Sequence, residues 1–156
     1  MNIEVKVNAI IKYIIAETED EKQNAIALLK FENMAPKQVE NSVDKEISEI
    51  LLEIGFTENI KGYYYIVYGI KLAVENPRII KGITKELYPS IAKEFSAEAR
   101  RVERAMRTAI NKAFDRSPSE IIAKYFGNTI AFDKGTPTNS EFIAKISNIV
   151  RRKNYK

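Results

Sequence analysis

The sequence predicts an all-α protein, and two patterns support that fold class. Apolar residues recur at the three- and four-residue spacing of a helix over most of the 156 residues, for example over residues 43–54. Helix start and stop signals also occur at nearly every junction between these stretches. Alternation of the kind found in strands is confined to residues 2–7, and it is weak. A chain of this length is enough for one ordinary domain, or for a small domain with an appendage.

The first 33 residues are expected to form a short strand or a helix start, followed by two helices. Thr18 and Glu21 have the spacing of a capping box, in which each side chain bonds the backbone N–H of the other residue, and they mark the start of the second helix. Pro36 indicates a linker after these helices. We therefore divide the chain into an N-terminal segment, residues 1–38, and a domain, residues 39–156.

The first helix of the domain is expected over residues 42–54, where the apolar positions share one face. Gly55 follows it at the place of a left-handed cap residue. Thr57 is the expected cap of the next helix, which contains the four tyrosines of residues 63–68 and ends at Pro77. Exposed tyrosines on this helix would suit base stacking. Packing is the favoured interpretation, because aliphatic residues alternate with the rings.

Helical spacing continues through the second half of the chain. Residues 83–95 contain Pro89, so a kink or a restart is expected there, and a helix over residues 97–114 follows. Ser117 is the expected N-cap of a short helix that ends at Gly127. The remaining expectations are an extended stretch over residues 129–132 and a last helix over residues 138–152 that begins with a capping box.

Two residue types, cysteine and histidine, are absent, and their absence excludes several kinds of catalytic and metal-binding site. Without cysteine the chain has no disulfide framework, no thiolate nucleophile and no cysteine zinc site. Without histidine it lacks the most common general base and the most common metal ligand. No glycine-rich phosphate-binding loop pattern occurs either. We therefore expect a protein that is not an enzyme and that holds no cofactor and no metal ion.

Location is inferred from hydropathy. No stretch approaches the roughly 18 consecutive apolar residues of a transmembrane helix, and the N-terminus has no signal-peptide pattern. We expect a cytoplasmic protein without a membrane partner.

Charge is unevenly distributed along the chain. Residues 1–50 hold 6 Lys against 10 Asp and Glu, whereas residues 51–156 hold 19 Lys and Arg against 11 acidic residues, so the two parts carry −4 and +8. This asymmetry suggests an acidic appendage joined to a basic module of the kind that binds nucleic acid. The alternative is a basic surface that serves solubility.

Residues 88–114 have the spacing of a helix-turn-helix. Such a motif needs a small residue where the two helices cross, a small residue in the turn and an aliphatic residue early in the second helix. Ala92, Ser96 and Val102 stand at these three positions. The second helix is then the recognition helix, which enters the major groove of DNA.

The second helix has one packed face and one basic face. At about 100° per residue, Val102, Met106, Ala109 and Ala113 share the packed face. The opposite face collects side chains that match base edges, because Arg pairs with guanine and Asn with adenine; it comprises Arg100, Arg104, Arg107 and Asn111. The alternative is a solvated face held by pairs such as Glu103 with Arg107. The helix-turn-helix spacing and the basic module favour double-stranded DNA as the partner.

The chain also resembles a known family on several strings. They are EIG at residues 53–55, IKGY at 60–63, ITKELYPSIAKEF at 83–95, RVERAMR at 101–107 and PTNSEFIA at 137–144. On these strings residues 51–152 are similar to the C-terminal DNA-binding effector domain of the master sporulation response regulator of endospore-forming bacteria, the stage 0 sporulation protein A family. Their order and separations make this resemblance far more specific than the helix-turn-helix spacing alone.

The resemblance implies a six-helix domain whose fourth helix reads a short TGTCGAA-like box. It aligns Glu103, Arg104 and Arg107 with the base-reading residues, and Thr108 stands where the family has a histidine. The complete set of expected base-reading residues is Glu103, Arg104, Arg107, Thr108 and Asn111, flanked by Ser96, Arg100 and Arg101 as phosphate or flanking contacts. The resemblance further implies a contact with RNA polymerase sigma factor through Ser119, Glu120 and Lys124.

Upstream the chain departs from the family. The family's regulator carries a phosphoacceptor receiver domain, whereas only about 40 residues precede the effector region here, too few for a five-stranded α/β receiver. We therefore expect a transcriptional regulator without a receiver. The alternative is a protein-interaction module that sequesters sigma factor or a full-length sporulation regulator.

The N-terminal segment exposes more apolar surface than two short helices can hide against each other. We expect it to dock on a second copy of itself and form a symmetric homodimer. Docking back onto its own domain is the second alternative.

Overall fold

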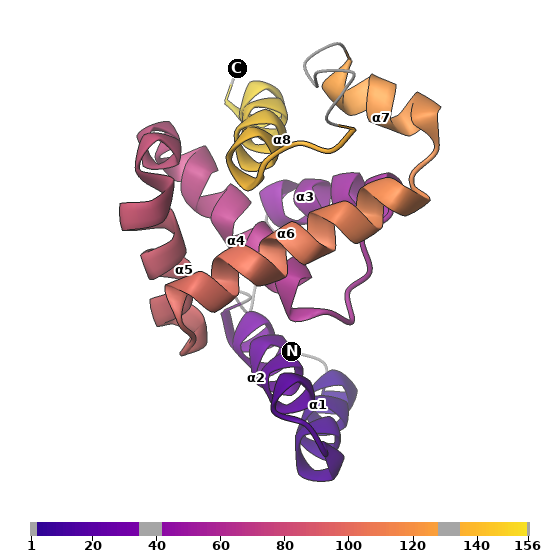
Figure 1. The fold of residues 1–156 in the computed structure, drawn as a ribbon, viewed down its shortest axis with the longest axis vertical. Helices are drawn as coiled ribbons and strands as arrows, with labels where there is room; N and C mark the ends of the chain where they lie inside the picture. The colour runs from indigo at the N-terminus through magenta and orange to yellow at the C-terminus, as the bar shows by residue number, and fades with distance from the viewer. Residues whose placement is uncertain (1–2, 35–41, 128–134, 156) are drawn as a thin grey trace.

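Figure 1 shows the fold in a computed structural model, which describes residues 3–34, 42–127 and 135–155. Every regular element in these ranges is helical, so the all-α prediction is confirmed. The alternative of a short strand at residues 2–7 is wrong, because α1 (Ile3–Ile15) already begins there. The predicted linker around Pro36 and the predicted extended stretch over residues 129–132 lie outside the described residues.

The N-terminal hairpin consists of α1 and α2 (Glu19–Met34), which pack side by side and extend away from the other helices (Figure 1). The predicted capping box is confirmed at the start of α2. The Glu21 N–H donates to Thr18 Oγ1 at 3.2 Å, and the Thr18 N–H donates to Glu21 Oε2 at 3.1 Å. The backbone donors of Thr18 and Glu17 hold the pKa of Glu21 below its ordinary value.

From residue 42 onward, the described residues form six α-helices, here called the six-helix domain. They are α3 (Ser42–Ile54), α4 (Lys61–Glu75), α5 (Tyr88–Phe95), α6 (Ala99–Arg116), α7 (Ser119–Phe126) and α8 (Asn139–Asn154). A 3₁₀-helix, η1 (Pro77–Gly82), and a π-helical turn, η2 (Ile83–Leu87), connect α4 to α5. In this part of the chain α6 is the fourth α-helix, the position that the resemblance implies for the recognition helix.

Helix α4 forms the centre of the six-helix domain and packs mainly on α6 and α8. Its Tyr63, Tyr64 and Tyr65 are at most 5% exposed. The Tyr65 ring meets Phe95 edge-on, with 5.1 Å between ring centroids. The tyrosines therefore have the packing role that the sequence favours, and these three buried rings are not available for base stacking.

Several predicted breaks are confirmed. Gly55 ends α3 with φ at +111°, a conformation that L side chains rarely adopt, and its N–H donates to the Leu51 carbonyl at 3.2 Å. Helix α4 ends just before Pro77, and the N–H of Arg78 donates to the Asn76 side chain at 3.2 Å. Pro89 lies in the first turn of α5, where the chain restarts after η2.

Two predicted caps are wrong. Thr57 does not cap α4; the N–H of its first residue, Lys61, donates instead to Asn24 Oδ1 of α2 at 3.0 Å. Ser117 is not the N-cap of α7, whose N-cap position is Pro118. Ser117 ends α6 instead, because α6 runs farther than predicted and the Ser117 N–H still donates to the carbonyl of Ala113.

The N-terminal hairpin docks on the six-helix domain through α2, which contacts α4 and α5. Two α2 side chains meet the start of α4: Asn24 accepts from the Lys61 N–H, and Asp20 Oδ1 lies 2.8 Å from Lys61 Nζ. Ala27 is buried in the shared core, and Leu28 packs against it. For α2, then, the structure shows the second alternative, docking onto its own domain.

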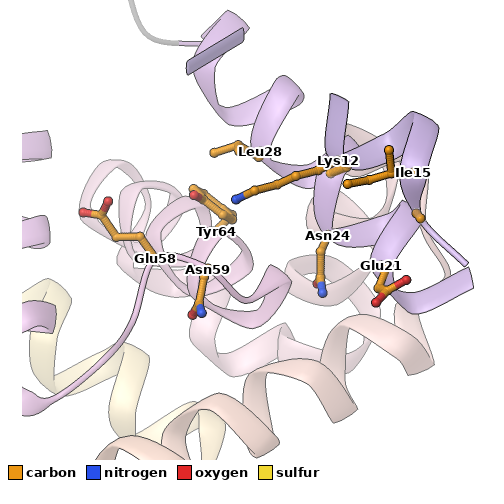
Figure 2. Close-up of a pocket in the computed structure, with 10 residues that line it drawn as sticks. Lys12, Ile15, Glu21, Asn24, Leu28, Glu58, Asn59 and Tyr64 are labelled. Atoms are coloured by element: carbon orange, nitrogen blue, oxygen red, sulfur yellow. The ribbon is translucent and has the colours of Figure 1, made fainter. Parts of the chain in front are cut away.

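Helix α1 packs chiefly on α2 and leaves a gap on the side of the domain. A cavity of about 490 Å³ separates the N-terminal hairpin from the connection between α3 and α4 (Figure 2). In Figure 2, Lys12 reaches from α1 across this cavity towards Tyr64, and Glu58 and Asn59 stand on the opposite wall. In the described part of the chain, the hairpin is thus anchored on the six-helix domain mainly through α2.

Candidate nucleic-acid interface

The helix-turn-helix predicted at residues 88–114 is formed by α5 and α6, which pack directly on each other. Ser96 makes the turn in the left-handed region, with φ at +52° and ψ at +46°. The following N–H, of Ala97, donates back to the carbonyl of Ala92 at 2.9 Å. Ser96 is exposed at the end of α5, as expected of a residue that flanks a reading helix.

Helix α6 has the two faces that the sequence predicts. Its buried face carries the four predicted packing residues, and Ile110 and Phe114 extend it: Val102, Met106, Ala109 and Ala113 are at most 1% exposed. All the predicted base-reading and flanking residues of α6 are exposed: Arg100, Arg101, Glu103, Arg104, Arg107, Thr108 and Asn111. The packed face fixes α6 against the domain, so the basic face points to solvent.

The basic side chains of α6 are largely free of acidic partners. In the described part of the chain, the ion pair made by α6 joins Arg101 Nε to Glu98 Oε2 across 3.8 Å. The alternative pair of Glu103 with Arg107 is not among the ion pairs of the described residues. The Arg100, Arg104 and Arg107 side chains are therefore available to meet phosphates or base edges.

The position of α6 depends on a close approach to α4 at Gly62. A Cβ built on Gly62 would lie 2.4 Å from the Ala105 carbonyl oxygen and 2.8 Å from Ala109 Cβ. Only glycine allows the two helix backbones to come this near. The glycine of the IKGY string is thus a structural requirement of the reading helix.

Asn139, the first residue of α8, also holds α6 in place. Its side chain is 1% exposed, and Nδ2 donates to the Glu103 carbonyl and to the Tyr88 hydroxyl, both at 3.0 Å. It therefore ties α8 to α5 and α6 at once. Burial raises the pKa of Tyr88, so its hydroxyl stays protonated at neutral pH. The sequence reasoning missed Asn139; its presence inside the PTNSEFIA string was the available signal.

Asn139→Ala is expected to lower the free energy of unfolding by about 1–3 kcal/mol, because it leaves the buried Tyr88 hydroxyl without its partner and removes the link to α6. DNA affinity should fall for all duplexes alike, since orientation of the whole helix is affected. Thermal or urea unfolding and an anisotropy titration measure the two effects. Asn148→Ala, at an exposed position of the same helix, is the control and should change neither quantity.

The expected sigma-factor residues lie on α7. Ser119 and Glu120 are exposed in its first turn. Lys124 is exposed too, but its Nζ pairs with Glu53 Oε1 of α3 at 2.6 Å. The Tyr125 hydroxyl also donates to Glu53, and these partners hold the pKa of Glu53 below its ordinary value. Glu53, from the EIG string, thus fastens α7 to α3.

One flank of α6 faces the N-terminal hairpin across a cleft of about 440 Å³, here called the basic cleft. Four basic side chains line it: Lys61, Arg101, Arg104 and Lys112. Thr108 lies in the same lining, and Asp20 and Asn24 stand on the α2 side. The structure thus brings Arg104, Thr108 and Arg101 to one shoulder of the helix.

The acidic character predicted for the N-terminal part is more local than expected. Residues 1–38 hold 5 Lys against 6 Asp and Glu, so this segment is nearly neutral. Three of its six acidic side chains, Glu19, Asp20 and Glu21, lie in the first turn of α2. Within residues 1–50, three further acidic side chains, Asp44, Glu46 and Glu49, belong to α3 and not to this segment. The first turn of α2 is the part of the hairpin beside the basic cleft.

These features define a helix-turn-helix DNA-binding domain of the transcription-regulator class: an exposed basic recognition helix, held by α4, α5 and α8 in an all-α fold. The family model described as sporulation initiation factor Spo0A C terminal matches residues 47–150. The chain belongs to this family, the DNA-binding effector domains of a sporulation regulator, which is not a family of enzymes.

The described ranges, residues 3–34, 42–127 and 135–155, contain neither a membrane-spanning helix nor a metal-binding cluster. No helix there is long and apolar enough to cross a membrane. No group of three or more acidic residues in the same ranges is arranged to hold a metal ion.

Proposed function

We propose that this protein is a sequence-specific regulator of transcription that binds a TGTCGAA-like box in double-stranded DNA. The observation that carries the proposal is the exposed face of α6, the second helix of the motif, where no ion pair among the described residues holds Arg100, Arg104 or Arg107. Glu103, Arg104, Arg107, Thr108 and Asn111 are the proposed base readers, with Ser96, Arg100 and Arg101 at flanking phosphates. We further propose that the protein acts in the cytoplasm and that its function depends on these contacts and not on catalysis.

A titration with two labelled duplexes tests this function. One duplex contains a TGTCGAA-type box and the other contains the same bases in scrambled order, both at physiological salt, because the phosphate contribution depends strongly on salt. Tighter binding of the box supports the proposal. Equal affinity for both duplexes would remove sequence specificity.

The alternative function, a protein-interaction module, is supported by the surface of α7. Ser119 and Glu120 are exposed there, and Lys124 lies beside them as the proposed third sigma-factor contact. Capture of purified sigma factor or of a full-length sporulation regulator by a protein that binds neither duplex would favour this module. A regulator that both binds the box and contacts sigma factor would satisfy the main proposal.

The surface that we propose for the homodimer lies on α1, because α2 is already docked on the six-helix domain. In the described part of the chain, helix α1 leaves six large apolar residues partly or mostly exposed: Val7, Ile10, Ile11, Tyr13, Ile14 and Ile15, with Ile14 at 72% and Ile15 at 67%. Two such faces pair readily about a two-fold axis. We propose that residues 1–38 act as the dimerisation segment and residues 39–156 as the effector domain.

The double variant Ile11→Glu with Ile14→Glu is expected to convert the dimer to a monomer, because each new carboxylate would be buried in the interface. Affinity for tandem boxes should fall while affinity for a single box stays the same. Sedimentation at micromolar concentration and duplexes with one or two boxes measure this. Leu52→Glu, at an exposed apolar position of α3, is the control. A parent chain that sediments as a monomer would contradict the proposal.

A further inference from the structure

The first turn of α2 places an acidic side chain on a lysine beside the recognition helix. Asp20 Oδ1 lies 2.8 Å from Lys61 Nζ, and Lys61 keeps the pKa of Asp20 below its ordinary value. The two side chains differ sharply in exposure: Lys61 is 19% exposed and Asp20 is 83% exposed. The lysine is thus part of the wall of the domain, whereas the aspartate approaches it from the solvent side.

Lys61 stands in the basic cleft with three cations of the reading helix. Arg101, Arg104 and Lys112 of α6 line the same space, and Thr108 lies between Arg104 and Lys112 along the helix. At about 100° per residue Arg101 and Lys112 lie on one shoulder of α6, and Arg104 lies between this shoulder and the arc of Arg107 and Asn111. When a recognition helix lies in the major groove, a sugar-phosphate strand runs along such a shoulder. The cleft therefore has the charge and the place of a phosphate site.

We infer that the basic cleft binds a backbone phosphate of the DNA, with Lys61 as its principal donor, and that Asp20 occupies Lys61 until the phosphate replaces it. The inference rests on the proposed DNA-binding function and assigns a further contact to it. Binding exchanges one anion for another at Lys61, so the α2 carboxylate competes with DNA at every sequence.

The exchange does not require the N-terminal hairpin to leave the domain. Asn24 accepts from the Lys61 backbone N–H, and Ala27 and Leu28 pack at the core, all independently of the Asp20 side chain. Asp20 itself is exposed, and exposed ion pairs contribute little to stability. Its carboxylate can therefore swing into solvent while α2 stays docked.

Asp20→Asn tests the inference directly. The variant is expected to bind the box duplex and the scrambled duplex about two- to fivefold more tightly, by the same factor for both, because the competing charge is removed from a contact that reads no base. Lys61→Gln is expected to weaken both duplexes equally and to make the dependence of affinity on salt shallower by about one counterion. Unfolding curves for both variants verify that the fold is retained.

The double variant separates exchange at Lys61 from a general effect of net charge. In the Lys61→Gln background, Asp20→Asn should give no further gain, since the lysine that Asp20 covers is gone. Glu49→Gln is the matched control: it removes one exposed carboxylate on α3, a helix that packs mainly on α4 and α8, and should leave affinity unchanged.

Two results would overturn the inference. An Asp20→Asn variant that binds as the parent does, or an equal gain with and without Lys61, would show that no exchange occurs at this lysine. These failures are distinct from failure of the proposed function, which would appear in the parent chain itself as equal affinity for the two duplexes.

Discussion

Gly62→Ala is expected to separate α4 from α6 and to abolish DNA binding in a protein that is less stable. The new methyl group would lie 2.4 Å from a backbone oxygen and 2.8 Å from Ala109 Cβ, so a rotamer change cannot relieve the contact. Overpacking of this kind costs about 1–3 kcal/mol of unfolding free energy. Because α6 must shift to admit the methyl group, the orientation of its arginine face relative to the rest of the domain changes.

Urea unfolding and duplex titration measure the two consequences of Gly62→Ala. Gly69→Ala, on the same helix, is the matched control. A Cβ there would meet only the ends of flexible side chains, Ile91 Cδ1 at 3.3 Å and Ile143 Cδ1 at 3.5 Å. It should cost little, because alanine also favours the helix over glycine. Equal stability of the two variants would contradict the assigned role of Gly62.

Arg104→Ala is expected to cost about 1–3 kcal/mol in affinity for the TGTCGAA-type box and to relax the preference at one base position. Arg104 is exposed opposite the buried face of α6, and no ion pair among the described residues holds its guanidinium. Its guanidinium group is thus free to donate two hydrogen bonds to one guanine. Titration of the box and of single-base variants of it measures the effect.

Arg101→Ala provides the comparison for Arg104→Ala. Arg101 lies on the shoulder of α6 beside the basic cleft, where a phosphate contact is proposed. Its loss should weaken box and scrambled duplexes alike and make the salt dependence shallower. If Arg104→Ala binds both duplexes as the parent does, the assigned reading face is wrong.

Much of the candidate site follows from local sequence. The buried face of α6 at Val102, Met106 and Ala109 repeats with the period of a helix, so the opposite face is fixed by geometry once the helix is recognised. Ser96 and Gly55 were placed correctly for the same reason, because conformational preference acts within a few residues of the chain.

Contacts between distant segments were not predicted. Asn24 replaces Thr57 as the cap of α4 across 37 residues of sequence, and Asn139 reaches the carbonyl of Glu103 across 36. The residue type alone predicts neither contact, since an asparagine that is buried or half-buried gains its role from the donors and acceptors that packing brings to it.

The all-α class, the helix-turn-helix and the family could be predicted from the sequence, because they depend on periodicity, on turn residues and on strings that follow one another along the chain. The docking of the N-terminal hairpin, and the acidic residue that lies beside the reading helix, depend on packing between segments that are distant in the sequence. Composition gives only the net charge of a segment. Because residues 1–38 are nearly neutral, their composition does not indicate an acidic contact with the reading helix. Electrostatic effects depend on distance, and only the packing of α2 on α4 brings Asp20 within 2.8 Å of Lys61.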